Sequence, residues 1–321
     1  MDSNFHLDRL KYTEKILIVV LGPTAVGKSE IGIQIAKELN GEIINFDSMQ
    51  VYKGFDIGTA KVPPEKRENI PHHLIDILDK CEQFSAADFA KHAYSILKEI
   101  IERNKIPILV GGTGLYLRAL LNGIFPGPGR DEDVREEIMR EIEEFGTEKM
   151  WENLNKVDSE YAKRIDKNDK IRIIRGLEIF RLTGIPISAH FKNTRSLVED
   201  WKKIKVGVIM KKKKLYQKIN ERSEKMFFSG LLEEIKKLML KGIDENCPLF
   251  QALGYKWALK SLKGEISVEE AVRLTQRDTR HYAKRQLTWF KKEKGVHWFL
   301  PEDKEKIIEF IKKEIEWRKQ S

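Results

Sequence analysis

Ile16-Leu17-Ile18-Val19-Val20-Leu21-Gly22-Pro23-Thr24-Ala25-Val26-Gly27-Lys28-Ser29 is the most informative stretch of the chain. Its first six residues are apolar and rich in β-branched side chains, which predicts a short buried strand of a parallel sheet. The eight residues from Gly22 to Ser29 match the pattern G-x-x-x-x-G-K-[ST] without a mismatch. A helical pattern of apolar residues follows as far as Leu39. Strand, glycine-rich loop and helix therefore come in the order that a phosphate-binding loop (P-loop) needs.

The next segments continue this alternation of strand and helix. Residues 42–46 predict a second buried strand, and residues 106–110 predict a third. Between them, Ser85 and Asp88 form the capping-box pattern that opens a helix, whose apolar stripe runs to Ile100. The first third of the chain is thus predicted to be α/β, a P-loop NTPase-like core with a parallel sheet flanked by helices.

The pattern changes at residues 125–129, which read Phe-Pro-Gly-Pro-Gly. This composition can continue neither a helix nor a strand, so it indicates a hinge or a domain junction. Residues 131–181 then show helical periodicity, and residues 206–210 predict a strand again. We therefore expect an inserted all-helical domain, residues 126–199. The core domain would comprise residues 1–125 and 200–321 and be mainly helical near its C-terminus.

Composition narrows the class of protein. The 321 residues include 59 Lys and Arg against 50 Asp and Glu, a net charge of +9. This excess favours a polyanionic partner such as nucleic acid, although lysine-rich surfaces also serve solubility alone. Cys81 and Cys247 can form neither a disulfide framework nor a cysteine-rich zinc site, so a reducing, cytosolic compartment is expected. No apolar run approaches the roughly 20 residues of a membrane helix, and residues 1–15 lack a signal-peptide core.

The P-loop has a specific chemistry. Gly22 and Gly27 allow backbone N–H groups to curl around a phosphate, and the helix N-terminus adds positive partial charge. Lys28 can reach the terminal phosphate oxygens, and Ser29 can ligate Mg²⁺. Most proteins with this loop are ATPases, GTPases or kinases, which usually carry a metal-binding Asp at the end of another strand. The third predicted strand is followed instead by Gly-Gly-Thr-Gly at residues 111–114, where that acid is missing.

The nearest acid at a strand end is Asp47, after the second predicted strand. Because the carboxyl ends of parallel strands face the ligand crevice, Asp47 is expected near the P-loop as a metal-shell acid or a general base. Capping of the turn at residues 48–50 is the alternative. Glycines at residues 111–114 favour close approach of a large substrate, or simply form a tight turn. His72-His73 is expected to be a structural pair at a strand start.

Two segments in the C-terminal third have the composition of RNA-binding surfaces. Eight lysines without an intervening acid fall between residues 202 and 218, which is typical of a solvated face or of a phosphate-backbone contact. Residues 281–292 interleave aromatic and cationic side chains, as stacking on unpaired bases requires. An amphipathic helix with Leu287 and Phe290 in the core explains the same pattern equally well.

Taken together, these motifs resemble the bacterial tRNA dimethylallyltransferase family, from about Ile16 to Trp298. The ordered motifs that carry the resemblance are Gly22 to Ser29, Asp47-Ser48-Met49-Gln50-Val51-Tyr52, Ile57-Gly58-Thr59-Ala60-Lys61, His72-His73-Leu74-Ile75-Asp76, Gly111-Gly112-Thr113-Gly114-Leu115-Tyr116, Gln251-Ala252-Leu253-Gly254-Tyr255-Lys256 and Thr279 to Phe290.

The resemblance implies transfer of a dimethylallyl group from dimethylallyl diphosphate to N6 of adenosine 37, beside the anticodon of tRNAs that read codons starting with U. It implies that the P-loop holds the diphosphate leaving group, with Mg²⁺ on Ser29, which accounts for the missing acid. Lys28 and Arg222 would stabilise the diphosphate. Asp47 would accept the proton of the attacking amine, and Thr113 would contact the same adenine.

A stacked adenine cannot react, so the resemblance implies that it is extruded from the anticodon stem-loop into the site. A cytoplasmic monomer that does not associate with membranes is the default expectation. One departure is Ile171, which stands where the family often has Gln. The residues that the resemblance implies for tRNA binding are Asp47, Ser48, Met49, Gln50, Thr113, Arg135, Ile171, Arg172, Ile173, Ile174, Arg175, Gln251, Gly254, Tyr255, Lys256, Lys284, Arg285, Gln286 and Trp289.

Two alternatives stay open at this level. A small-molecule kinase would use the same P-loop, but the missing strand-end acid argues against it. A non-catalytic RNA-binding protein would carry a vestigial P-loop, but the intact Lys28, Ser29 and Asp47 argue against that.

Overall fold

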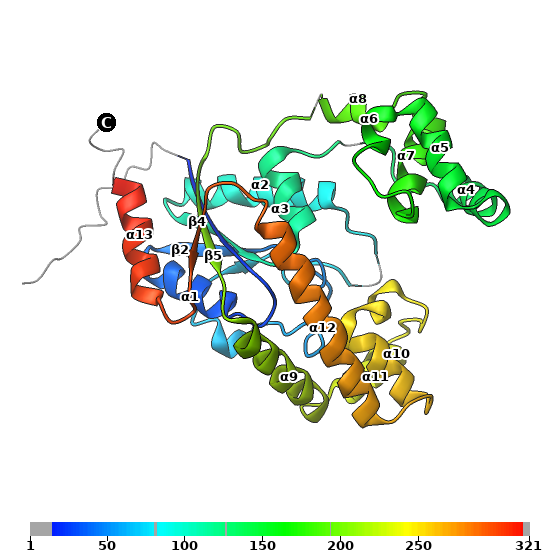
Figure 1. Ribbon diagram of the computed structural model, residues 1–321. Helices are drawn as coiled ribbons and strands as arrows, with labels where there is room; N and C mark the ends of the chain where they lie inside the picture. The colour runs from blue at the N-terminus through cyan, green and yellow to red at the C-terminus, as the bar shows by residue number, and fades with distance from the viewer. Residues whose placement is uncertain (1–14, 80–81, 126, 193, 317–321) are drawn as a thin grey trace, which may run out of the picture. The chain divides into compact units, whose positions relative to one another are not determined.

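The computed structural model describes residues 15–79, 82–125, 127–192 and 194–316. The chain divides into two compact units: Met1–Leu117 with Asp200–Ser321 forms the first, and Arg118–Glu199 forms the second (Figure 1). The division falls at residue 118, within helix α3 (Gly114–Asn122), whereas the Pro-Gly segment predicts it at residue 126.

The first unit is built on a six-stranded sheet with the order β3-β2-β4-β1-β5-β6. All neighbouring strands run parallel, which confirms the predicted α/β class. β1 lies between β4 and β5 and is buried along its whole length, so the strand that leads into the P-loop is fixed on both sides. The strands are β1 (Ile16–Leu21), β2 (Gly41–Asn45), β3 (His72–His73), β4 (Ile106–Gly111), β5 (Lys202–Val208) and β6 (Val296–Phe299).

β5 resumes the sheet after the second unit, but it begins earlier than the apolar run at residues 206–210 predicts. Lys202, Lys203 and Lys205 belong to this strand. Lys205 pairs with Glu293, and Lys202 lies 4.0 Å from the Glu314 carboxylate. Lys202 and Lys205 therefore interact with acidic residues of the first unit.

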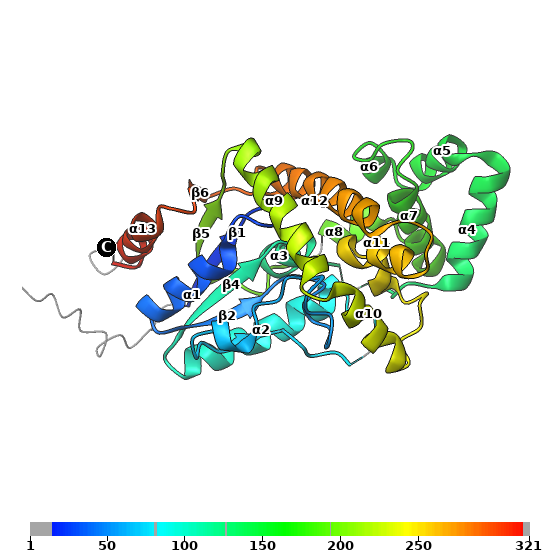
Figure 2. The same cartoon turned by 90° about the horizontal axis from the view of Figure 1, so that it is seen from below.

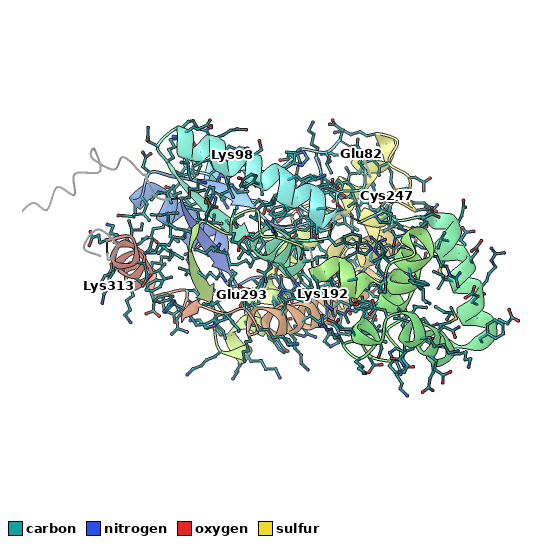
Figure 3. All side chains as sticks on the ribbon, turned by 90° about the horizontal axis from the view of Figure 1, so that it is seen from above. Glu82, Lys98, Lys192, Cys247, Glu293 and Lys313 are labelled. Atoms are coloured by element: carbon teal, nitrogen blue, oxygen red, sulfur yellow. The ribbon has the colours of Figure 1, made fainter. Side chains whose placement is uncertain are left out.

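Helices cover both faces of the sheet (Figures 1 and 2). α1 (Lys28–Glu38) and α13 (Lys304–Glu316) pack on one face, where Ile35 and Ile307 join a core with apolar residues of β1, β4 and β5. α2 (Ala86–Glu102) packs against β2 and β4. Exposed lysines such as Lys98 on α2 and Lys313 on α13 stand on the outer sides of these helices (Figure 3). None of the helices in the described part of the chain is long and apolar enough to cross a membrane.

Four further helices give the first unit a second core: α9 (Lys212–Phe228), α10 (Leu231–Leu240), α11 (Leu253–Leu262) and α12 (Val268–Phe290). Phe55, from the segment after β2, packs edge-on against Tyr255 with 5.2 Å between ring centroids.

Cys247 in this core is disulfide-bonded, so the expectation of a reducing compartment gains no support from it. The 3₁₀ turns are η2 (Pro64–Lys66) and η3 (Pro248–Gln251).

The second unit is helical and has a core of its own. Ile138, Leu154 and Ile173 are fully buried there and come from three different helices. Its helices are α4 (Glu132–Phe145), α5 (Thr147–Val157), α6 (Ser159–Ala162), α7 (Lys170–Thr183) and α8 (Ile187–Lys192).

Glu42 in β2 gives the first testable prediction. Its carboxylate is buried and lies within hydrogen-bonding distance of three side-chain nitrogens: Arg103 Nη2 at 2.7 Å, His73 Nε2 at 2.7 Å and Lys105 Nζ at 3.0 Å. Burial alone would raise the pKa of Glu42, but the three hydrogen bonds outweigh it and hold the pKa at about 2. The stabilisation is therefore present above the unfolded-state pKa near 4.5 and is lost as the pH falls toward 2.

Glu42→Gln is expected to lower the free energy of unfolding at pH 7 by about 2–3 kcal/mol, because the buried side chain loses the charge that pairs with Arg103 and Lys105. The variant should also lose less stability than the wild type between pH 4.5 and 2. Urea unfolding at a series of pH values measures both effects. Parallel curves for the two proteins would show that Glu42 does not carry the acid sensitivity.

Candidate active site

The P-loop connects the end of β1 to the start of α1. Gly22 has φ +150°, and a Cβ on it would lie 2.4 Å from the carbonyl oxygen of Val208, so only glycine fits. Gly27 caps α1 with φ 95°. The Lys28 ammonium donates to the carbonyl of Pro23 at 2.8 Å, and Ser29 is exposed in the first turn of α1. The loop thus lies between a buried strand and a helix, in the order that its sequence predicts.

Lys28, Asp47 and Arg222 share one electrostatic environment. Burial lowers the pKa of Lys28 to about 8, with Asp47 opposing the shift and Arg222 adding to it. Burial lowers the pKa of Arg222 to about 10, against the charge of Asp47. Arg222 Nη2 also donates to Thr24 Oγ1 at 2.6 Å, which brings α9 to the P-loop. Two desolvated cations facing one carboxylate make a site suited to a polyanion.

Asp47 follows β2 at the carboxyl end of the sheet. Its Oδ1 accepts from the Met49 N–H at 3.0 Å, so the predicted turn cap is present. Asn45 holds the Asp47 backbone on both sides, accepting from its N–H at 3.2 Å and donating to its carbonyl at 3.3 Å. Burial raises the pKa of Asp47, although the Met49 N–H, Lys28 and Arg222 all oppose this. Among the described residues Oδ2 has no hydrogen bond, so capping and proton acceptance are compatible.

The glycine-rich segment after β4 lies beside Asp47. A Cβ on Gly111 would approach the backbone of Phe46 to 2.7 Å, so this glycine permits the two strand ends to meet. The Thr113 N–H donates to the Phe46 carbonyl at 3.2 Å, and Thr113 Oγ1 accepts from the Ser48 N–H at 3.0 Å. Thr113 therefore fixes the segment that carries Asp47.

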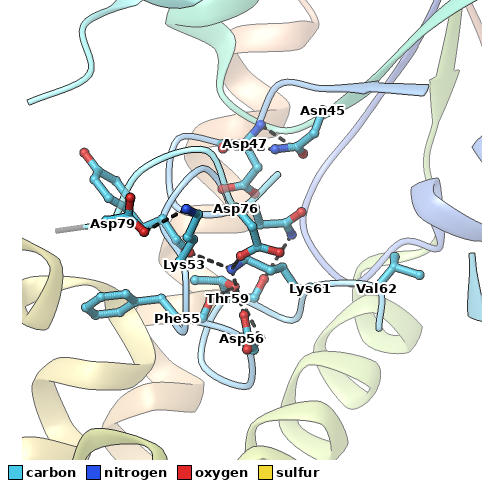
Figure 4. A network of polar contacts seen from close by, with 12 residues as sticks. Asn45, Asp47, Lys53, Phe55, Asp56, Thr59, Lys61, Val62, Asp76 and Asp79 are labelled. Carbon is cyan, nitrogen blue, oxygen red and sulfur yellow. Dashed lines mark hydrogen bonds and ion pairs between the residues drawn. The ribbon is translucent and has the colours of Figure 1, made fainter. Parts of the chain in front are cut away.

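The buried Lys61 forms hydrogen bonds that hold the segment after Asp47 in place (Figure 4). Lys61 Nζ donates to the Tyr52 carbonyl at 2.6 Å and to Asp56 Oδ1 at 2.7 Å, and it also contacts Asp76. The Asp76 N–H donates to the Gln50 carbonyl at 3.1 Å. Ser48, Met49 and Gln50 therefore lie, partly exposed, on a rigid loop.

α12 presents two different faces to its surroundings. Lys284, Arg285 and Trp289 are exposed, whereas Gln286 and Phe290 are buried. The amphipathic interpretation of residues 281–292 is therefore confirmed for Phe290, whereas contact of the exposed basic face with RNA stays a prediction. Gln286 accepts from the Thr24 N–H at 2.8 Å and donates to the Gly112 carbonyl at 2.9 Å. Its buried amide is occupied by protein groups, so a direct contact with tRNA does not fit this arrangement.

α11 requires a similar correction. Gly254 and Tyr255 are buried, and the Tyr255 hydroxyl donates to Glu234 Oε1 at 2.6 Å. The same Glu234 accepts from the Ile57 N–H at 2.8 Å. Gly254 and Tyr255 thus anchor the segment after β2 and do not face RNA. Gln251 is exposed and Lys256 partly so; both therefore stay candidates for RNA contact.

The arginines predicted to bind tRNA in the second unit surround a buried carboxylate. Glu178 is fully buried and pairs with Arg135 at 3.1 Å and with Arg175 at 2.8 Å. Ile173 and Ile174 lie in the core of this unit. Ile173 and Ile174 therefore do not fit a direct role in RNA binding. Arg135 and Arg175 are partly exposed and pair with Glu178, so a contact with RNA stays a prediction for both. Ile171, with 76% of its surface exposed, and the exposed Arg172 still can contact a partner.

Three charged residues have structural roles that the sequence did not predict: Lys61, which lies in one of the family motifs, Glu178 and Glu234. Only Glu178 has a signal in the sequence, a charged residue between the apolar Leu177 and Ile179.

Known proteins of similar sequence belong to one family of enzymes. A family model described as IPP transferase matches residues 50–293. The tRNA dimethylallyltransferase of Carboxydothermus hydrogenoformans is 47% identical over 298 residues, which cover 92% of this chain and 96% of that protein. The corresponding enzyme of Halothermothrix orenii is 42% identical over 300 residues, 92% of each chain.

Solved structures agree with this match. The crystal structure of full-length tRNA isopentenylpyrophosphate transferase from Bacillus halodurans has a TM-score of 0.71 at 40% identity, covering 96% of this chain and 99% of that chain. A eukaryotic dimethylallyltransferase acting on tRNA has a TM-score of 0.73 at 32% identity, covering 90% and 74%. These likenesses extend over nearly the whole chain. In the structure, Asp47 and Arg222 meet at the P-loop in one site. The chain therefore belongs to the tRNA dimethylallyltransferase family of enzymes.

Proposed function

We propose that this site transfers the dimethylallyl group of dimethylallyl diphosphate to N6 of adenosine 37 in tRNAs that read codons starting with U, and releases diphosphate. The observation that carries the proposal is the meeting of Asp47 with Lys28 and Arg222 at the P-loop. A proton acceptor and two cations in one place suit the transfer of a carbon group away from a diphosphate. The choice of nucleotide and of tRNAs rests on the family resemblance.

The donor side of the reaction is electrostatic. The bond between the allylic carbon and the diphosphate oxygen breaks, and negative charge grows on the leaving group while the carbon becomes cation-like. The P-loop amides, Lys28 and Arg222 stabilise that charge, because they are already oriented and partly shielded from water. The strand-end acid of NTPases has no task here, since no water needs activation and no phosphoryl group moves.

Mg²⁺ is part of the proposal. Among the described residues no group of three or more His, Cys, Asp or Glu side chains could hold a metal by itself. The exposed Ser29 hydroxyl in the first turn of α1 fits a cation whose other ligands are diphosphate oxygens. When bound, Mg²⁺ adds charge neutralisation to the leaving group.

The acceptor side depends on Asp47. The N6 amine attacks the allylic carbon, a carbon–nitrogen bond forms, and the amine proton passes to Asp47. Burial, which raises the pKa of Asp47, makes this carboxylate a stronger base than an exposed aspartate. Thr113 and the loop Ser48-Met49-Gln50 would hold the adenine, extruded from its stack, beside the carboxylate.

The proposed RNA contacts are exposed or partly exposed residues of each unit. Aromatic side chains among them would stack on unpaired bases, and cationic side chains would neutralise the RNA phosphates, as binding of unpaired RNA requires. We place the reaction in the cytoplasm, where tRNA is modified, and assign it to a monomer. In the first unit the proposed contacts are Lys284, Arg285 and Trp289 on α12, with Gln251 and Lys256 near α11. In the second unit, taken by itself, they are Ile171 and Arg172 on α7.

Mass analysis of nucleosides tests the proposal. Unmodified tRNA with adenines at positions 36, 37 and 38 is incubated with enzyme, Mg²⁺ and dimethylallyl diphosphate. The expected product carries one C5H8 unit on adenosine 37 alone. A gain at another nucleotide would overturn the assignment of the acceptor, and no gain at all would overturn the proposed reaction.

A further inference from the structure

Gln286 connects parts of the first unit that are far apart in sequence. Its side chain is 6% exposed and lies on the inward face of α12. The amide oxygen accepts from the Thr24 N–H in the P-loop, 262 residues away. The amide nitrogen donates to the Gly112 carbonyl, 174 residues away. Both ends of one amide are therefore used to join two loops.

Only an amide of this length can make both bonds. The Thr24 N–H can only donate and the Gly112 carbonyl can only accept, so the orientation of the Gln286 amide is fixed by its partners. The fit is close, because a Cβ on Gly112 would lie 2.4 Å from Gln286 Nε2. A shorter asparagine would not span the gap, and a glutamate would place a carboxylate oxygen against a carbonyl oxygen.

The two loops carry opposite halves of the proposed chemistry. Thr24 is also held by Arg222 and belongs to the loop that would bind the leaving group. Gly112 is followed by Thr113, which bonds the Ser48 N–H next to Asp47. The bridge from Gln286 therefore fixes the distance from the diphosphate site to the proton acceptor.

We propose that Gln286 is a positioning residue that holds the P-loop and the Gly111-Gly112-Thr113 segment in the alignment that transfer requires. The inference rests on the proposed function and deepens it. Gln286 acts through Thr24 and Gly112 and does not itself touch RNA. Misplacement of reacting groups by about 1 Å costs about 100-fold in rate, so a single bridge at this place carries a large effect.

The test compares Gln286→Leu with Gln276→Leu, the same change on α12 at a partly exposed glutamine that bonds Glu224 instead. With donor and tRNA saturating, kcat of Gln286→Leu is expected to fall about 100-fold, while its Kd for tRNA stays within about threefold of the wild type. Gln276→Leu should leave both near wild type. A loss confined to tRNA affinity would overturn the inference and return Gln286 to the RNA surface.

Gln286→Glu supplies a readout that a merely structural role would not change. Its ionised carboxylate repels the Gly112 carbonyl, whereas the protonated acid can donate to it again. The rate of this variant relative to the wild type should therefore rise as the pH falls from 8 to 6. A ratio that does not change with pH would contradict the bridge.

Failure of the proposed function can be told apart from failure of this inference. If the wild type transfers nothing to tRNA, the proposed function fails. Binding of inorganic diphosphate with Mg²⁺ then reports on the bridge, and Gln286→Leu is expected to bind it about tenfold more weakly than Gln276→Leu, the effect of one lost hydrogen bond. Equal affinities would overturn the inference.

Discussion

Asp47→Asn is expected to lower kcat about 10²–10⁴-fold, while the affinity for tRNA stays within about threefold of the wild type. The asparagine oxygen can still accept from the Met49 N–H, so the turn is kept and only proton acceptance is lost. Because burial raises the pKa of Asp47, the wild-type rate should fall on the acid side at a higher pH than an ordinary aspartate would give. The residual rate of Asp47→Asn should not show this decrease at acid pH.

Single-turnover rates between pH 4 and 8 measure this prediction, and Asp79→Asn is its control. Asp79 lies near the same network, but it is largely exposed and pairs only with Lys53 among the described residues (Figure 4). Its variant should follow the wild-type curve. An Asp47→Asn rate within a few-fold of the wild type would show that another group accepts the proton.

Lys28→Ala is expected to lower kcat/KM for dimethylallyl diphosphate about 10²–10³-fold and to leave the Kd for tRNA within about threefold. Lys28 is desolvated in the P-loop, and its pKa is lowered to about 8, so an arriving diphosphate should restore the charged form. The donor should therefore bind with proton uptake at pH 8, and its affinity should fall as the pH rises further.

Calorimetric titration of diphosphate in two buffers of different ionisation heat measures that proton uptake. Lys37→Ala, on the exposed side of α1 where Lys37 pairs with Glu68, is the matched control. Equal losses of donor use and tRNA binding in Lys28→Ala would contradict the assignment of Lys28 to the leaving group. So would the absence of proton uptake in the wild type.

Local patterns predicted the part of the fold that lies nearest the chemistry. β1, the P-loop and α1 are contiguous, so their hydrophobic periodicity and glycine spacing contain the whole structural signal. The helix opened by Ser85 begins as its capping box predicts. His72 and His73 form a short strand, as expected, and His73 pairs with Glu42. β5 was misplaced because its lysines alternate with apolar residues and so conceal a strand of the sheet.

Burial and long-range pairing could not be predicted in the same way. The motif Gln251 to Lys256 does not say which of its side chains face inward. Tyr255 packs against Phe55 and donates to Glu234, and both partners lie outside the motif. Arg135 and Arg175 were predicted only as RNA contacts, and the sequence did not show that both also pair with the buried carboxylate of Glu178. Gln286 likewise takes its role from partners that the sequence places more than 170 residues away.

The most direct test of the central claim, that this P-loop holds a leaving group and not a phosphoryl donor, is the stoichiometry of a single reaction. Wild-type enzyme is given tRNA, dimethylallyl diphosphate, Mg²⁺ and ATP, and released diphosphate, ADP and modified adenosine are counted together. We predict one diphosphate for each modified adenosine and no ADP. Formation of ADP in step with the modification, or diphosphate release without it, would contradict the account.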